Sequence, residues 1–403
     1  MTPEIKQRIA QLNNGEVPIG YEKTDFGIFP CDWVTDKKLK DLGSFGKGKG
    51  LPGDKMTTEG VPCVGYGDIY MKYNHFHFEE AQTFVDEETA SESQPIHKGT
   101  LLFTGTGETA DEIGKCVCYN GDETIYAGGD IITFVAEKVN PLFLAYQQYQ
   151  EFSLRKKASF GQGHSVVHIQ RENLEKLNVA YPKSTEEQSK IAEILMKWDE
   201  AIRLKEQYIE KLKERKKSIL VSLLTPQSHW ESVKVKDIFK ITRGQVLPTN
   251  QCSDSGKYPV YSSQTADNGL MGYYDEYLFE NCITWTTDGA NAGDVNFRKG
   301  KFYCTNVCGV LISDQGYANL CVAHIIGKVA KNYVSYIGNP KLMNNTMGII
   351  TIDLPSLNEQ EKISNIIENL NCEIQLQNEG RNCLIVQRKA LQQYLLNGIV
   401  RVK

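Results

Sequence analysis

Two glycine-containing stretches of the sequence carry lysine or arginine in a pattern that suits contact with phosphate groups. Residues 33–56 hold six lysines against three aspartates, and residues 230–248 hold three lysines and one arginine against two acidic residues. Gly48 and Gly244 lie beside these cations, and glycine lets a backbone approach a phosphate closely. Solvated surface loops can have the same composition. The recurrence of the pattern in two parts of the chain favours phosphate binding.

Two further loop-forming stretches also occur twice. Residues 103–109 and 285–291 each begin with an aromatic residue and continue with Thr, Gly, acidic or amide residues. Residues 159–164 and 337–341 form the second pair. Hydroxyl and amide groups suit hydrogen bonding to phosphates and base edges, although the same residues are good turn formers. Both interpretations stay open for these stretches.

These stretches supply the candidate nucleic-acid contacts. We expect the cations to contact phosphate or guanine, and these are Lys47, Lys49, Arg243 and Lys341. We expect the polar residues to read base edges, and these are Thr104, Thr106, Gln162, His164, Gln245, Thr287 and Asn291. Residues 203–217 are also rich in cations, but a solvated helix face explains them better than direct contact.

Motifs for catalysis are missing. The sequence contains no phosphate-binding loop and no zinc-protease or hydrolase motif, and no dinucleotide fingerprint follows the glycines at 105–107. None of the 13 prolines is adjacent to another, so the Pro-Pro-aromatic step of DNA amino-methyltransferases is absent. The eleven cysteines include no Cys-x-x-Cys, which predicts a reduced, cytoplasmic protein without a zinc site. We therefore expect no catalytic residue, metal or cofactor on this chain.

The overall composition is that of a globular protein. The 403 residues carry a formal net charge of -5, and 40% of them are hydrophobic. No apolar run approaches the roughly 20 residues that a membrane span needs. The acidic total argues against a polybasic binder but not against nucleic acid, because basic loops can lie within an acidic average.

The chain is internally duplicated. Residues 39–52 align with 235–248 at an offset of 196, and 187–191 align with 359–363 at an offset of 172. The second copy is therefore about 24 residues shorter within its globular part. The order is globular, helical, globular, helical.

The helical parts share a 3.5-residue apolar period, which is typical of helices that pack on each other as a coiled coil. Each is expected to run for roughly 36–40 residues, or about 55–60 Å. Two ordinary amphipathic core helices are the alternative. The predicted interface residues are Ile191, Leu195, Trp198, Ile202, Ile209, Leu212, Ile219, Leu223, Ile363, Ile367, Leu370, Ile374, Leu384, Leu391 and Leu395.

With these features the chain resembles the specificity subunits of type I restriction–modification systems. The resemblance rests on residues 21–33, on the segment from Pro182 to Ala192 that enters the first long helix, on 216–224, and on the repeat at 360–396. It implies two target-recognition domains that each read one half of a split DNA sequence. It also implies two modification subunits that supply S-adenosylmethionine chemistry, and restriction subunits that use ATP and Mg.

The expected fold class is α+β, with two mixed, strand-rich target-recognition domains separated by two long helices that form an antiparallel coiled coil with pseudo-twofold symmetry. The expected segments are 1–32 (N-terminal helix and lead-in), 33–182 (first recognition domain), 183–226 (first long helix), 227–355 (second recognition domain) and 356–403 (second long helix). The expected function is non-catalytic reading of double-stranded DNA with a bipartite, asymmetric target. A coiled-coil assembly scaffold and a stand-alone enzyme are the alternatives.

Overall fold

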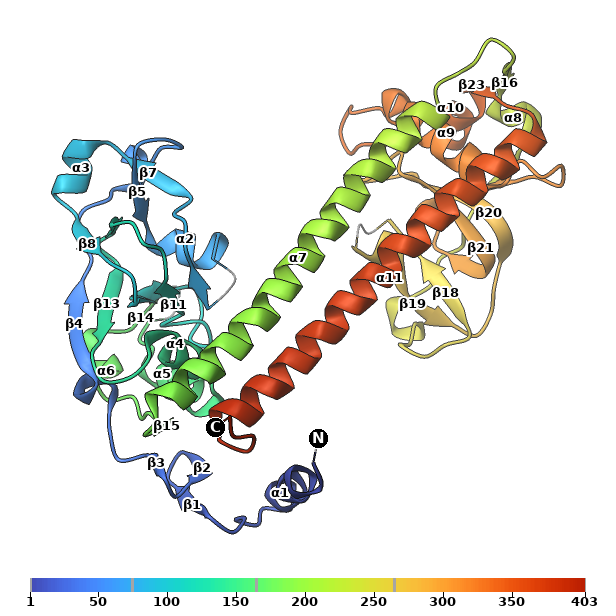
Figure 1. Ribbon diagram of the computed structural model, residues 1–403. Helices are drawn as coiled ribbons and strands as arrows, with labels where there is room; N and C mark the ends of the chain where they lie inside the picture. Colours follow the sequence, from blue (N-terminus) through green and yellow to red (C-terminus); the bar gives the residue numbers. More distant parts are fainter. Residues whose placement is uncertain (1, 74–75, 164–165, 264–265, 403) are drawn as a thin grey trace. The chain divides into compact units, whose positions relative to one another are not determined.

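The computed structural model describes residues 2–73, 76–163, 166–263 and 266–402, and it divides into two compact units (Figure 1). Unit 1 comprises residues 1–204 with 381–403, and unit 2 comprises residues 205–380. Each unit holds a strand-rich domain and part of each of two long helices, α7 (Thr185–Leu223) and α11 (Leu357–Leu396). The predicted α+β class, with two strand-rich domains and two long helices, is confirmed.

Unit 1 is built around two main sheets. The five-stranded sheet has the order β4 (Gly43–Lys47), β13 (Ile131–Ala136), β9 (Thr100–Thr104), β11 (Cys116–Tyr119) and β6 (His77–Phe78). The four-stranded sheet has the order β7 (Thr83–Val85), β5 (Val61–Val64), β12 (Ile125–Ala127) and β8 (Gln94–Ile96). Three two-stranded pairs join β1 (Tyr21–Thr24) to β2 (Gly27–Pro30), β10 (Thr106–Gly107) to β14 (Val167–His168), and β15 (Tyr181–Pro182) to β3 (Trp33–Val34).

Short helices connect these strands. They are α1 (Pro3–Asn13), α2 (Tyr66–Met71), α3 (Glu87–Ser91), α4 (Pro141–Gln147), α5 (Glu151–Phe160) and α6 (Arg171–Leu174), with 3-10 turns at Leu39–Asp41 and Gly53–Lys55. The N-terminal segment is joined to the end of α11, because Arg8 and Tyr21 donate to the carbonyls of Ile399 and Gly398.

Unit 2 has one large sheet in the order β17 (Lys240–Arg243), β22 (Cys308–Ile312), β20 (Phe279–Thr286), β21 (Val295–Cys304), β18 (Tyr258–Tyr261) and β19 (Leu270–Tyr274). A separate pair joins β16 (Glu231–Lys234) to β23 (Thr351–Leu354). The helices are α8 (Val235–Ile238), α9 (Leu320–Ala330) and α10 (Asn344–Ile349), with 3-10 turns at Thr249–Gln251, Ala266–Gly269 and Lys331–Tyr333. Gly348 and Ile349 end α10.

The two long helices begin in the same way, which explains the repeated Glu-Gln motif. Ser184 accepts from the backbone of Glu187, and Ser356 accepts from that of Glu359, so each serine satisfies a free amide of the first turn. Gln188 and Gln360 then each donate to a proline carbonyl at 2.8 Å, that of Pro182 and Pro355 respectively.

The same glutamines attach each strand-rich domain to its long helix. Gln188 accepts from the backbone of Asn140 at 2.8 Å, and Asn140 caps α4. Gln360 accepts from the side chain of Asn319 at 2.9 Å, and Asn319 caps α9. One buried amide thus fixes a short helix against a long helix in both units.

The long helices pair in an antiparallel manner. In unit 1, Asp199 of α7 contacts Arg388 of α11. In unit 2, Lys205 contacts Gln377, and Tyr208 lies 3.4 Å from Glu373. Positions rise along α7 as they fall along α11, as an antiparallel pair requires. Every predicted interface residue is buried or half-buried.

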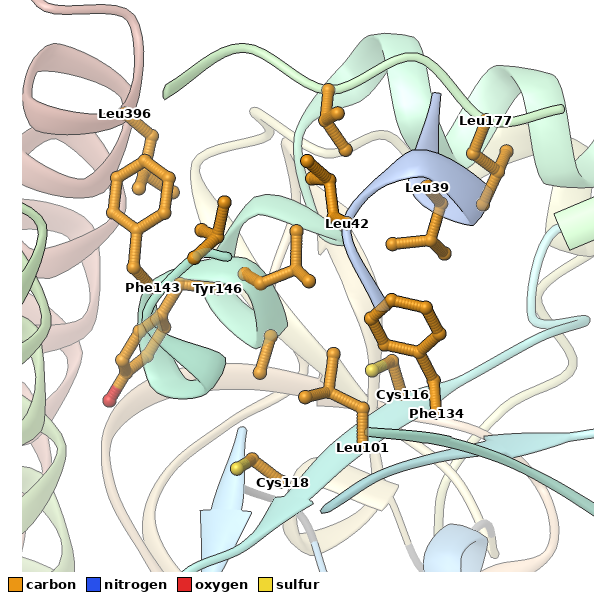
Figure 2. Packing of buried hydrophobic residues seen from close by; sticks show 14 of the residues in the cluster. Leu39, Leu42, Leu101, Cys116, Cys118, Phe134, Phe143, Tyr146, Leu177 and Leu396 are labelled. Atoms are coloured by element: carbon orange, nitrogen blue, oxygen red, sulfur yellow. The ribbon is translucent and has the colours of Figure 1, made fainter. Parts of the chain in front are cut away.

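The core of unit 1 lies between the five-stranded sheet and the helix ends. Figure 2 shows Leu101, Cys116 and Phe134 of the sheet facing Leu39, Leu42 and Leu177, while Phe143 and Tyr146 of α4 lie toward Leu396 of α11. No helix in the described part of the chain combines the length and the apolar character that crossing a bilayer needs.

Candidate nucleic-acid interface

Most of the predicted contact residues gather at one end of each sheet. In unit 1, Lys47 at the end of β4 pairs with Ile132, and Thr104 at the end of β9 pairs with Ile131. In unit 2, Arg243 at the end of β17 pairs with Gly309, and Thr286 at the end of β20 pairs with Cys308. We call the loops that leave this end of each sheet the loop end. They are residues 47–50, 104–115, 128–131, 162–163 and 166–169 in unit 1, and 243–246, 286–294, 305–308 and 335–342 in unit 2.

The two basic stretches enter the loop end through equivalent hydrogen bonds. The Gly48 and Lys49 amides donate to Ile131 and Ala127 at 2.8 and 3.0 Å. The Gly244 and Gln245 amides donate to Cys308 and Cys304 at 3.0 and 3.1 Å. The alignment of Gly48 with Gly244 is thereby confirmed.

Both glycines are required by the backbone packing. A Cβ on Gly48 would lie 1.8 Å from the carbonyl oxygen of Gly128, and one on Gly244 would lie 2.2 Å from that of Cys304. Either distance is far inside van der Waals contact. The glycines therefore hold the basic strand end against the neighbouring loop, and this packing, rather than approach to a phosphate, accounts for their presence.

The second repeated loop is also held in the same way in both units. The amide of Gly105 donates to Asp130 at 2.8 Å, and the amide of Thr287 donates to Val307 at 3.0 Å. Their carbonyls accept from Ile169 at 3.0 Å and from Leu342 at 2.9 Å. The alignment of residues 103–109 with 285–291 is correct.

The third repeated loop differs from its predicted alignment. Gln162 and His168 exchange two backbone hydrogen bonds, and so do Ser335 and Lys341. Gln162 is thus equivalent to Ser335, and His168 to Lys341. The pairing of residues 159–164 with 337–341 was wrong, because these loops share a backbone closure and not a sequence motif.

The predicted cations all lie at the loop end. Lys47 and Lys49 are exposed. Arg243 is half-buried, and its Nε donates to the side chain of Asn344 at 3.2 Å. Lys341 lies 3.9 Å from the carboxylate of Asp288, and its side chain is 50% exposed.

Two predicted base readers need correction. Thr104 and Thr287 are both 0% exposed. The Thr104 hydroxyl lies 2.8 Å from that of Tyr70, while the Thr287 hydroxyl donates to the carbonyl of Val307 at 3.0 Å. Because neither hydroxyl can reach a base, both residues shape the loops from inside.

The remaining polar candidates differ in availability. Gln162 and Gln245 are exposed, and Thr106 is half-buried with its hydroxyl 3.3 Å from Nδ1 of His168. The Asn291 amide donates to the carbonyl of Ser263 at 2.9 Å, so it braces a neighbouring loop. His164 lies outside the described residues.

Three residues that lie in the loop end of unit 1 or contact it carried no recognisable sequence signal. The Tyr70 hydroxyl contacts Thr104 and the carbonyl of Thr106, and burial raises the pKa of Tyr70. Lys115 lies over the Tyr70 ring, and burial lowers the pKa of Lys115. Lys157 of α5 donates to the carbonyl of Gly114 at 2.9 Å, and burial lowers the pKa of Lys157 to about 8. These residues come from distant elements, so only the fold brings them together.

The loop end offers hydrogen bonds and positive charge, which suit binding. Among the described residues, no group of three or more His, Cys, Asp or Glu side chains could hold a metal ion.

Comparison with known proteins gives a consistent result. A family model described as the type I restriction modification DNA specificity domain matches residues 30–214 and, a second time, residues 227–385. A putative type I specificity subunit from Mycoplasma pneumoniae is 40% identical over 143 residues, which is 34% of this chain and 76% of that protein. Another putative type I specificity subunit from the same organism is matched over about half of its own length, 46%.

Longer matches are more distant. A putative type I restriction enzyme specificity subunit from Methanocaldococcus jannaschii is 23% identical over 423 residues, covering 95% of this chain and 97% of that one. The crystal structure of an S subunit of a type I restriction–modification system from M. genitalium has a TM-score of 0.63 at 17% identity, covering 90% of this chain and 96% of that one. At this identity the structural match concerns the fold.

Proposed function

The chain belongs to the type I restriction–modification DNA specificity family, and from this membership we propose that it reads a bipartite, asymmetric DNA target through its two loop ends. One observation carries the proposal. The two loop ends share their backbone hydrogen bonds but present different side chains. Lys49 corresponds to Gln245, Thr106 to Asp288, and His168 to Lys341. A common backbone with different reading groups suits two different half-sites.

The role of the chain in its complex follows from the same membership. We propose that it is non-catalytic and directs two modification subunits and the restriction subunits to the target. S-adenosylmethionine, ATP and Mg would bind to those partners, with no cofactor on this chain. We also propose a cytoplasmic location, the compartment of the DNA to be read. A scaffold without DNA contacts is the competing function, and it gives no reason for the two loop ends to differ.

The decisive experiment exchanges recognition domains. Residues 33–182 or 227–355 would be replaced by the matching domain of a specificity subunit with a different known target, and methylated sites would be mapped across the genome. We expect one half of the methylated sequence to change with each exchange. An unchanged methylation pattern would favour the scaffold.

Point substitutions test where DNA binds. Lys47→Ala and Arg243→Ala should each weaken DNA binding by the assembled complex, and they should do so for all sequences alike if they contact phosphates. The matched controls are Lys98→Ala and Lys240→Ala, since Lys98 precedes the opposite end of β9 and Lys240 lies at the opposite end of β17. If the controls weaken binding as much as the loop-end variants do, the loop end is not the DNA face.

A further inference from the structure

Unit 2 contains a polar cavity of about 390 Å³ beside its loop end. Thr286, Gly293 and Asp294 line it from the base of loop 286–294, and Lys331 and His324 line it from the segment 324–331. Asn291 links loop 286–294 to the wall of the cavity. Its side chain donates to the carbonyl of Ser263, and the adjacent Ser262 lines the cavity.

A buried arginine forms part of the wall of this cavity. Arg298 of β21 is 8% exposed, its Nε donates to Thr284 at 3.0 Å, and its Nη2 donates to the carbonyl of Asn268 at 2.7 Å. The guanidinium lies 3.7 Å from the ring centroid of Tyr261. These contacts are to neutral groups. Among the described side chains, which do not include those of residues 266 and 267, no carboxylate lies at ion-pair distance from Arg298. A buried charge without a counter-ion is costly, so Arg298 is poised for an anion from outside the chain.

Other charges around the cavity add to this effect. Lys328 and Lys331 lie on its lining, whereas Asp294 supplies a carboxylate 2.8 Å from Lys331. The lining thus carries three cations and one carboxylate, although the Lys328 ammonium donates to the carbonyl of Leu224 at 2.9 Å. Burial, and then the charge of Lys216, lower the pKa of His324, which leaves it neutral at pH 7 and able to donate one hydrogen bond.

The corresponding place in unit 1 has no such cation. The backbone of Thr104 bonds to Lys115 and that of Thr286 to Asp294, so Lys115 corresponds to Asp294 and Tyr119 to Arg298. Tyr119 is 1% exposed and packs in an apolar cluster. Because the shared fold tolerates an aromatic residue at this place, the fold does not require Arg298, and a role specific to unit 2 explains it.

We propose that this cavity binds a phosphate group, with Arg298 and Lys331 as its principal ligands, and that in the assembled complex the group is a backbone phosphate of the DNA read by unit 2. The assignment to DNA rests on the proposed function. Guanidinium binds phosphate through paired donors in a fixed plane, and lysine adds a mobile point charge. A bound phosphate would fix the position of the DNA beside loop 286–294 without itself carrying sequence information.

The salt dependence of DNA binding tests whether the bound phosphate group belongs to the DNA backbone. Complexes assembled with the full chain would be compared as wild type, Lys331→Gln and Arg298→Met, with Lys299→Gln as the matched control. Lys299 is the neighbour of Arg298 and pairs with Glu368, and it does not line the cavity. We expect both cavity variants to lower affinity about tenfold at low salt and to reduce the slope of log K against log salt by about 0.9, on specific and non-specific DNA alike. Lys299→Gln should leave both quantities unchanged.

Inorganic phosphate tests whether the cavity binds free phosphate instead. Titrated into the isolated chain, it should raise the melting temperature of the wild type and of Lys299→Gln, but not that of Arg298→Met. Stabilisation by phosphate with unchanged DNA slopes in both variants would assign the cavity to a free phosphate and overturn the DNA assignment. Unchanged slopes without stabilisation would overturn the site altogether. Neither result would affect the proposed function, which fails if exchange of the recognition domains leaves the methylated sequence unchanged.

Because Arg298→Met removes buried contacts, Lys331→Gln provides the second, exposed variant. The side chain of Lys331 is 63% exposed, so its substitution leaves the core intact. A slope change in Arg298→Met that Lys331→Gln does not share would count against the phosphate site.

Discussion

Arg388 of α11 donates from Nε to Asp199 of α7 at 2.8 Å, and the two side chains are 8% and 6% exposed. The Tyr146 hydroxyl of α4 donates to the same carboxylate at 2.6 Å. The ion pair between the two long helices thus also holds the recognition domain of unit 1 against them, through α4. Burial and the adjacent carboxylate raise the pKa of Tyr146, which stays protonated as the donor.

Replacing Asp199 should therefore be costly. We expect Asp199→Asn to lower the free energy of unfolding by about 3–5 kcal/mol, because it leaves Arg388 buried without a counter-charge. The neighbouring Glu200→Gln breaks an exposed pair with Arg203 and should cost no more than about 1 kcal/mol. Urea denaturation of the full chain measures both. Equal effects would show that the buried network does not anchor unit 1.

Lys157 should make stability depend on pH. Its pKa is about 8 in the folded chain, because burial disfavours the charged form, against the usual lysine value of 10.5 when the chain is unfolded. Between these values the unfolded chain binds more protons, so this lysine's contribution to stability rises with pH from about 8 to about 10.5, by about 3 kcal/mol. We expect Lys157→Met to be more stable than the wild type at pH 7, and this advantage to shrink across that window.

The difference in free energy of unfolding between the wild type and Lys157→Met separates the effect of Lys157 from that of other groups that titrate at high pH. Lys156→Met is the control, since Lys156 is the exposed neighbour. A constant stability difference between wild type and Lys157→Met from about pH 7 to about pH 10.5 would contradict the buried cation.

The glycine at the basic strand end should not accept a side chain. We expect Gly48→Ala to lower the free energy of unfolding by about 1–3 kcal/mol and to weaken DNA binding by the complex, since a Cβ there collides with the carbonyl of Gly128. Gly53→Ala is the matched control, because nothing lies within 4 Å of a Cβ at Gly53. Calorimetry and DNA titration would measure the two effects, and a Gly48→Ala chain with wild-type behaviour would refute the packing argument.

The polar contact between the long helices in unit 2 should lower the stability of the chain while it fixes the register of one helix against the other. Lys205 donates to Gln377, and both side chains are half-buried. We expect the double change Lys205→Leu with Gln377→Leu to stabilise the chain by about 1–3 kcal/mol, because apolar pairs pack without a desolvation cost. Lys211→Leu, at an exposed position, is the control for added hydrophobicity. A destabilised double variant would show that the layer contributes to stability.

Much of this architecture could be predicted because it is repeated or periodic in the sequence. The offset of 172 aligns Glu187 with Glu359 in the sequence, and in the fold each has a basic partner, Arg401 and His229 respectively. The 3.5-residue period predicted both long helices, since a helix places every third or fourth residue on one face. The alignment of Gly48 with Gly244 could likewise be predicted from the sequence.

Only the tertiary structure decided which loop residues are available. Thr104 and Thr287 have the composition of base readers, yet their hydroxyls face the interior. His168 and Lys341 became equivalent through a backbone closure that leaves no sequence motif, and Arg298 faces a cavity whose walls come from β20, β21 and α9. The sequence by itself determined the repeated elements, because their periodicity is local. The exposure of each side chain depends on contacts between residues far apart in the chain, and those are set only when the chain folds.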